Sequence, residues 1–125
     1  QYQMAQMKVV TERASSATVP VVVAGDLNAV PWTAAFRRML TTGRLVDSQL
    51  WSGWQPSWPS GKPIVVLKPL GLVFAPDISF LRFLVCLPID HFLVSPVIGT
   101  RDRQVGKDVG SDHFPVSIML VPVTK

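Results

Sequence analysis

The feature that most constrains the fold of this chain is a short apolar run that stops abruptly at a glycine and an aspartate. Residues 21–24 read Val-Val-Val-Ala and are followed directly by Gly25 and Asp26. A uniformly apolar, β-branched run of this length is typical of a strand buried on both faces. We therefore predict a buried strand that ends at Asp26.

Helical patterns lie on both sides of this strand. Apolar residues recur at helical spacing from residue 1 to about residue 13, which predicts a moderately amphipathic helix. After the strand, Thr33 is suited to cap a helix through residue 40, and Gly43 is suited to its C-terminal stop. Helix, buried strand, loop and helix in succession predict a layered α/β fold.

The second half of the chain favours strands. Three tryptophans, three prolines and two glycines between residues 51 and 63 predict a long rigid loop rather than a periodic element. Strands are expected near residues 64–67, 72–74 and 80–87, and more clearly at residues 89–95 and 115–121.

Size and charge set broad limits. The chain has 125 residues, of which 48% are hydrophobic, so it can bury one core but is short for two. We expect a single domain or part of one. The net charge is +4, and the basic residues are scattered without a run that reads as a nucleic-acid arm. This balance permits RNA, DNA or a phosphorylated lipid as a partner without requiring one.

The lone cysteine and the apolar segments bear on the compartment. Cys86 has no second thiol to pair with, so we expect an inert core thiol and, from it, a cytoplasmic, reducing location. The most apolar region, residues 64–87, is interrupted by charged residues and prolines, and we interpret it as buried strands rather than a membrane span.

Because the chain begins with Gln1, we expect it to be an excerpt of a longer protein. Whether a targeting or membrane segment lies upstream is left open.

Asp26 and Asn28 are the first candidate site residues. They follow the end of the buried strand, where open α/β sheets place their ligand crevice, and residues i and i+2 of an extended segment face the same side. A carboxylate can accept a proton from an attacking water, and a carboxamide can donate to a phosphate oxygen. Taken alone, the pair also fits an Asx turn or a helix cap.

Asp112, His113 and Asp90 are the other candidates. Asp112 offers a hard oxygen ligand for Mg²⁺ beside the imidazole of His113, although taken alone the pair also fits a solvated turn. Asp90 opens a predicted strand between apolar neighbours, so its carboxylate needs a partner, and histidine is the natural one. The alternative for Asp90 is a carboxylate that caps a local turn.

Three segments, in this order, resemble the last three motifs of the magnesium-dependent branch of the endonuclease/exonuclease/phosphatase superfamily. They are GDLNAVP at residues 25–31, IDHFLVS at residues 89–95 and GSDHFPV at residues 110–116. Each is weak alone, whereas their joint order, spacing and hydrophobic flanks agree with the family. The resemblance runs from about residue 20 to residue 121, which is about half of a family domain.

The resemblance implies a role for each candidate residue. Asp26 would orient or deprotonate the attacking water, and Asn28 would hold the phosphate. Asp112 would belong to a Mg²⁺ site, with Mn²⁺ as a possible substitute. Asp90 would brace the catalytic imidazole of His113, which would contact the phosphoryl oxygen. His91 is interpreted as structural or as a support of the site.

The same resemblance implies a layered sandwich of two central mixed sheets with outer helices, of which residues 1–125 would be the C-terminal portion. Family members also use an early Asn and a metal-binding Glu from an N-terminal half, which no segment before residue 20 supplies. We therefore expect the missing N-terminal half of the domain as a partner, little activity in the excerpt alone, and possible self-association through an exposed apolar face.

These observations favour a metal-dependent hydrolase of phosphodiester or phosphomonoester bonds, nuclease-like, acting on nucleic acid or a phospholipid headgroup. The alternative is a non-catalytic interaction or nucleic-acid-binding remnant of the same fold. Two further sets of side chains have a functional and a structural interpretation. Trp51, Trp54 and Trp58 could stack on bases or could anchor the loop through buried rings, and Arg37 and Arg38 could approach phosphates or face solvent.

Overall fold

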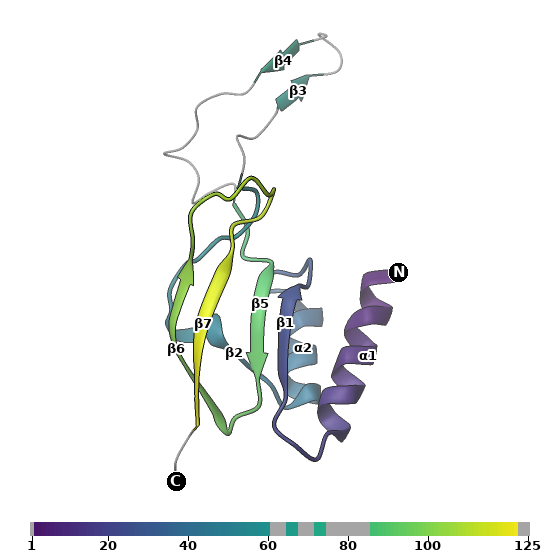
Figure 1. The fold of residues 1–125 in the computed structure, drawn as a ribbon. Coiled ribbons are helices and arrows are strands. Elements are labelled where there is room, and N and C mark those ends of the chain that lie inside the picture. The colour runs from purple at the N-terminus through teal and green to yellow at the C-terminus, as the bar shows by residue number, and fades with distance from the viewer. Residues whose placement is uncertain (1, 61–64, 68–71, 75–85, 123–125) are drawn as a thin grey trace.

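A computed structural model of the chain describes residues 2–60, 65–67, 72–74 and 86–122 (Figure 1). The helices are α1 (Tyr2–Ser16), α2 (Ala34–Gly43) and the 3-10 helix η1 (Ser48–Trp51). The strands are β1 (Val22–Asp26), β2 (Val46–Asp47), β3 (Val65–Leu67), β4 (Leu72–Phe74), β5 (Asp90–Val94), β6 (Ile98–Val105) and β7 (Val116–Pro122). The α/β class is confirmed, and so are both predicted helices and the strands at 21–24, 64–67, 72–74, 89–95 and 115–121.

The strands that organise the described part of the chain pair in antiparallel fashion. β5 lies in the middle of a sheet of order β1-β5-β2, with Val22 opposite Val94 and Asp26 opposite Asp90. β2 is short and pairs only with Val94 and Leu93. β6 pairs with β7, and β3 pairs with β4. Most of the predicted strand at residues 80–87 lies outside the described residues.

The core lies between this sheet and the two helices, which cover one of its faces (Figure 1). Buried side chains from α1, α2, β5 and the adjoining loops form it, namely Met7, Ala29, Phe36, Met39, Leu45 and Leu93. Val23 of β1 packs against this cluster, whereas Val22 is 40% exposed on the opposite side. The prediction that residues 21–24 are buried on both faces is therefore wrong, because α1 and α2 cover only one face.

The ends of α2 follow local chemistry. The Thr33 hydroxyl accepts a hydrogen bond from the Phe36 amide at 3.3 Å, which confirms Thr33 as the N-cap. The helix ends at Gly43 as expected, but the left-handed residue after it is Arg44, with φ 53°. Gly43 instead supplies space, because a Cβ there would lie 3.2 Å from the Leu45 side chain.

The aromatic segment after α2 is only partly a loop. Trp51 ends the short helix η1, and Trp58 forms an isolated β-bridge with Leu87. Cys86, beside this bridge, is buried, as predicted for a core thiol, and its sulfur lies 3.5 Å from the carbonyl of Pro59. The bridge brings residues 57–60 next to the start of β5.

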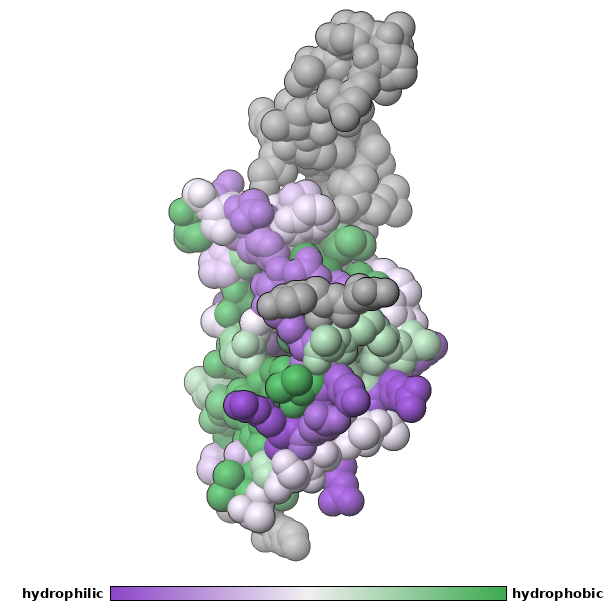
Figure 2. Space-filling model, turned by 90° about the vertical axis from the view of Figure 1, so that its right-hand side faces the viewer, coloured by the Kyte–Doolittle hydropathy of each residue, from purple (hydrophilic) through white to green (hydrophobic). Residues whose placement is uncertain are grey.

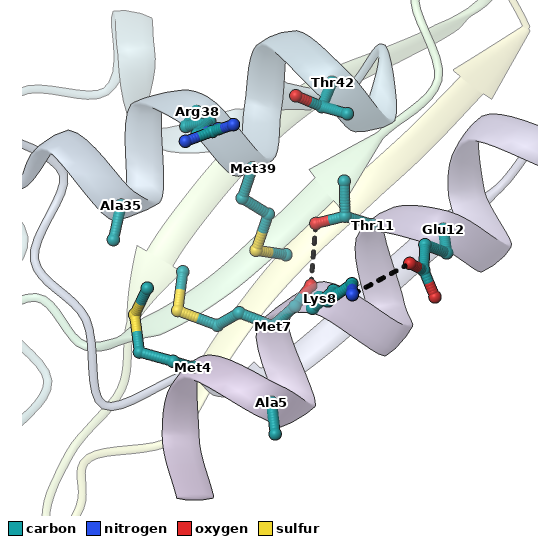
Figure 3. A pocket seen from close by; sticks show the side chains of 10 residues that line it. All are labelled: Met4, Ala5, Met7, Lys8, Thr11, Glu12, Ala35, Arg38, Met39 and Thr42. Carbon is teal, nitrogen blue, oxygen red and sulfur yellow. Dashed lines mark hydrogen bonds and ion pairs between the residues drawn. The ribbon is translucent and has the colours of Figure 1, made fainter. Parts of the chain in front are cut away.

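An apolar groove of about 530 Å³ lies between α1 and α2 (Figure 3). Met4 and Met7 of α1 and Met39 of α2 line it, and Lys8 is paired with Glu12 near one end. Seen from the side of α1, hydrophilic and hydrophobic residues are interspersed over the surface (Figure 2). None of the predicted site residues lines this groove. Among the described residues, no helix has the length and apolar character needed to span a membrane.

Leu93 tests the position of the core. Its side chain is fully buried in the cluster, so Leu93→Ala should lower the free energy of unfolding by about 2–5 kcal/mol in urea denaturation. Leu50→Ala is the matched control, because Leu50 is 64% exposed and its truncation should change stability by less than about 0.5 kcal/mol. Equal effects of the two substitutions would contradict this description of the core.

Candidate active site

The register of β1 and β5 places two carboxylates opposite each other at one end of the sheet. Asp26 is the last residue of β1, Asp90 is the first residue of β5, and the two are Cα partners. The Leu27 amide continues the pairing by donating to the Ile89 carbonyl at 3.0 Å. Residues that are 64 positions apart in the sequence thus flank one point on the surface.

His113 lies between these carboxylates. Its Nδ1 is 2.8 Å from Oδ2 of Asp90, and its Nε2 is 3.8 Å from Oδ2 of Asp26. Because a carboxylate only accepts hydrogen bonds, Nδ1 bears a proton and donates it to Asp90. Nε2 faces Asp26, and the His113 side chain is partly exposed. The partner expected for the Asp90 carboxylate is therefore present.

The surroundings of His113 favour its charged form. The hydrogen bond to Asp90 raises the pKa of His113 above its usual value, while partial burial acts in the opposite direction. The negative charges of Asp90, Asp26 and Asp112 add to the increase. The imidazole of His113 is thus protonated more readily than that of a free histidine.

Asn28 approaches Asp26 through a tight turn. Its amide donates to Oδ1 of Asp26 at 2.7 Å, and its side-chain nitrogen donates to Oδ2 at 3.0 Å. Asn28 has φ 48°, so the expectation of an extended segment with i and i+2 on one side is wrong. The local Asx turn considered from the sequence is what brings the two side chains together. Gln3 of α1 supports this turn by donating to the carbonyls of Leu27 and Asn28.

Asp112 is next to His113 but does not share its contacts. The side chain is exposed, and its Oδ1 accepts a hydrogen bond from the Ser111 hydroxyl at 3.5 Å. Its carbonyl accepts from the Ser60 amide at 2.8 Å, which fixes the loop. Within residues 2–60 and 86–122, no group of three His, Cys, Asp or Glu side chains is arranged to hold a metal ion. The residues described here do not form a metal site by themselves.

A family model described as the endonuclease/exonuclease/phosphatase family matches residues 1–113. The chain belongs to this family. The resemblance inferred from the three motifs is thereby confirmed, and the family's members are hydrolases of phosphoester bonds.

Two solved structures have the same family fold as this chain. One is the mannosyl-6-phosphatase Bt3783 of Bacteroides thetaiotaomicron, with 19% identity and a TM-score of 0.52 over 95% of this chain and 44% of that one. The other is an endonuclease/exonuclease/phosphatase family protein from Bacteroides thetaiotaomicron, with 20% identity and a TM-score of 0.60 over 94% of this chain and 43% of that one. The present chain thus spans less than half the length of either. A comparison with curated protein sequences gave no significant match.

Several polar residues that the sequence did not single out support the family motifs. The Ser57 hydroxyl accepts from the Asp90 amide at 3.2 Å, and Arg103 donates to the Asp90 carbonyl at 3.0 Å. Nothing in the local sequence patterns marks either residue. The Trp58 ring lies beside the His113 ring, with centroids 6.5 Å apart. Ser57 and Arg103 thus contact the main chain of Asp90, and Trp58 contacts His113.

His91, which follows Asp90, is structural as expected. It is buried, its Nε2 donates to the Ala29 carbonyl at 2.8 Å, and its Nδ1 lies 3.3 Å from Oδ2 of Asp47. The Asp47 carboxylate also accepts from the Gln49 amide at 3.0 Å and so caps η1. His91 therefore ties the loop that carries Asn28 to β2 and η1.

The surface near Asn28 has room for a ligand. A hollow of about 400 Å³ borders it, lined partly by Trp58, Leu87 and Ile89. Trp32 stacks on Trp54 with ring centroids 5.6 Å apart, and Trp51 is almost fully exposed. The alternative in which buried rings anchor the loop is therefore wrong, because Trp51, Trp54 and Trp58 are all exposed.

Arg37 and Arg38 are both exposed on α2, as expected for side chains that face solvent.

The pKa of His113 has a consequence for stability. A group whose pKa is raised on folding stabilises the fold fully below its unfolded value of about 6.5, and the contribution is lost as the pH rises through the folded-state pKa. The difference in unfolding free energy between the wild type and His113→Gln should therefore be largest under mildly acidic conditions and shrink toward alkaline pH. Urea unfolding at several pH values measures it, and a difference that grows with pH would contradict the arrangement.

Proposed function

We propose that this protein hydrolyses phosphoester bonds, with Asp26, Asn28, Asp90 and His113 as its catalytic residues. The observation that carries the proposal is the imidazole of His113 between the Asp90 and Asp26 carboxylates, 2.8 and 3.8 Å away. Such a site offers a proton acceptor and a cationic donor at one point, as attack of water on phosphorus requires.

Each residue would act through the atoms that it presents. The Asp26 carboxylate would accept the proton of the attacking water. Asp90 holds the proton on Nδ1 of His113, so Nε2 of the imidazolium would donate to a phosphoryl oxygen as negative charge develops. The side-chain Nδ2 of Asn28 would turn from Asp26 toward a nonbridging oxygen of the bound phosphate.

Metal dependence is part of the proposal. Magnesium, or manganese in its place, would neutralise charge on the phosphate, as divalent ions generally do in this family. Asp112 would supply one carboxylate ligand, and the remaining ligands would come from the N-terminal half of the domain, outside these residues. The excerpt alone would therefore have little activity.

The test is hydrolysis by the full-length protein of a substrate panel. It contains single-stranded and duplex DNA, RNA, a phosphoinositide, a sphingomyelin-like lipid and a hexose 6-phosphate, the last because one structural neighbour is named as a mannosyl-6-phosphatase. We expect turnover of at least one class and a loss of about 100-fold or more in kcat for His113→Ala. A folded full-length protein that turns over none of them would favour the alternative, a non-catalytic remnant of the fold.

Asp112→Asn tests the metal ligand. A chelator should abolish the activity, and Mg²⁺ should restore it. The variant should need a higher Mg²⁺ concentration for half-maximal rate, because it removes one anionic ligand. Asp108→Asn, in the same exposed loop, is the control. If the metal dependence of Asp112→Asn matched that of the wild type, Asp112 would not be a ligand.

A further inference from the structure

Asp90 needs support on one side, because the sheet does not continue there. β5 is the middle strand, and β1 covers the edge of Asp90 on one side. On the other side β2 pairs only with Val94 and Leu93, so it stops short of Asp90. The Asp90 amide and carbonyl would lack strand partners there, and backbone groups that are shielded from water require partners.

Side chains from two distant segments supply these partners. The Ser57 hydroxyl, fully buried, accepts from the Asp90 amide at 3.2 Å. The guanidinium of Arg103 donates through Nη2 to the Asp90 carbonyl at 3.0 Å. Arg103 is held in turn by Gln55, because Nη1 of Arg103 donates to Oε1 of Gln55 while the side-chain Nε2 of Gln55 donates to the Arg103 carbonyl at 2.9 Å.

A break in the β6–β7 pairing directs Arg103 inward. The register shifts between Arg101 and Gln104, and Asp102 within this bulge has φ 52°, a left-handed conformation that aspartate adopts more readily than most residues other than glycine. Bulges of this kind re-aim a side chain. Arg103 is only 5% exposed, whereas Arg101 and Gln104 on either side are exposed.

Burial of the guanidinium has a cost that nearby carboxylates oppose. Loss of solvent lowers the pKa of Arg103, and the charges of Asp47 and Asp90 raise it. A buried arginine that makes no direct ion pair with a carboxylate in the described structure is a costly choice for packing alone. Its directed hydrogen bond goes to the residue that holds His113.

We propose that Arg103 is a positioning residue for the proposed hydrolysis, and that it acts by holding the main chain of Asp90 where its carboxylate meets His113. The expected effect of Arg103 on the rate rests on the proposed function. Its expected effect on the Asp90–His113 hydrogen bond does not. Arg103 itself touches neither substrate nor the reacting atoms.

The experiment compares Arg103→Met with Arg101→Met in the full-length protein. Arg101 lies on the same strand but is exposed, so the same substitution there controls for the loss of a positive charge. We expect Arg103→Met to lower kcat about 10- to 100-fold with little change in KM, and Arg103→Lys to restore part of the loss because lysine can still donate to the Asp90 carbonyl. Arg101→Met should match the wild type.

A spectroscopic readout does not depend on turnover. The Nδ1 proton of His113 shared with Asp90 should give a distinct downfield proton resonance, assigned by its absence in His113→Gln. It should weaken or vanish in Arg103→Met while the fold, followed by circular dichroism, is kept. If Arg103→Met does not fold, Gln55→Met keeps the guanidinium but loosens it and should weaken the same resonance.

An unchanged His113 resonance in a folded Arg103→Met or Gln55→Met protein would overturn the positioning role, whatever the rates. Loss of the resonance in Arg103→Met, together with absence of activity in the wild type, would keep the positioning role and reject the proposed function. A rise in KM with unchanged kcat would overturn the role as well, because it would place Arg103 in substrate binding.

Discussion

The antiparallel pairing of β1 with β5 is the constraint on which the site depends. It sets Asp26 directly opposite Asp90, and like charges so placed in neighbouring strands repel one another. His113 lies between the two carboxylates and can carry the positive charge that offsets this repulsion. The same contacts that relieve an unfavourable pairing also give the imidazole its orientation and its raised pKa.

Buried polar side chains hold the segments that carry the Asp90–His113 pair and Asn28. His91 and Asp47 tie the loop of Asn28 to β2, while Ser57 and Arg103 hold the main chain of Asp90. Polar groups buried at these positions are costly unless they are paired, and each makes at least one directed contact. The active-site loops are thus fixed by side-chain hydrogen bonds at the point where the short strand β2 ends.

The sequence allowed much of this arrangement to be predicted, because some of its signals are local. The apolar run before Asp26, the Thr33 cap and the need of Asp90 for a histidine partner could each be inferred from a few neighbouring residues. The exposure of one face of β1 could not be inferred in this way, since it depends on which elements cover the sheet. Arg103 could not either, because its burial follows from a break in the β6–β7 register.

Asp112 is the one carboxylate that the described residues are proposed to offer to a metal ion. The family fold is present, and the side chains proposed to bind water and phosphate converge, while the described residues lack a group of metal ligands. This is consistent with a chain that spans less than half of the structures it resembles. The proposed chemistry therefore depends on the domain as a whole.

The central claim is that Asp26 and the Asp90–His113 pair act as one site, and a double-mutant cycle tests it most directly. It would measure kcat/KM of the full-length protein, of Asp26→Asn, of His113→Gln and of the double variant. The account predicts that the double variant loses little more than the worse single variant, because residues that act as a unit are not additive. Independent losses that multiply in the double variant would contradict it.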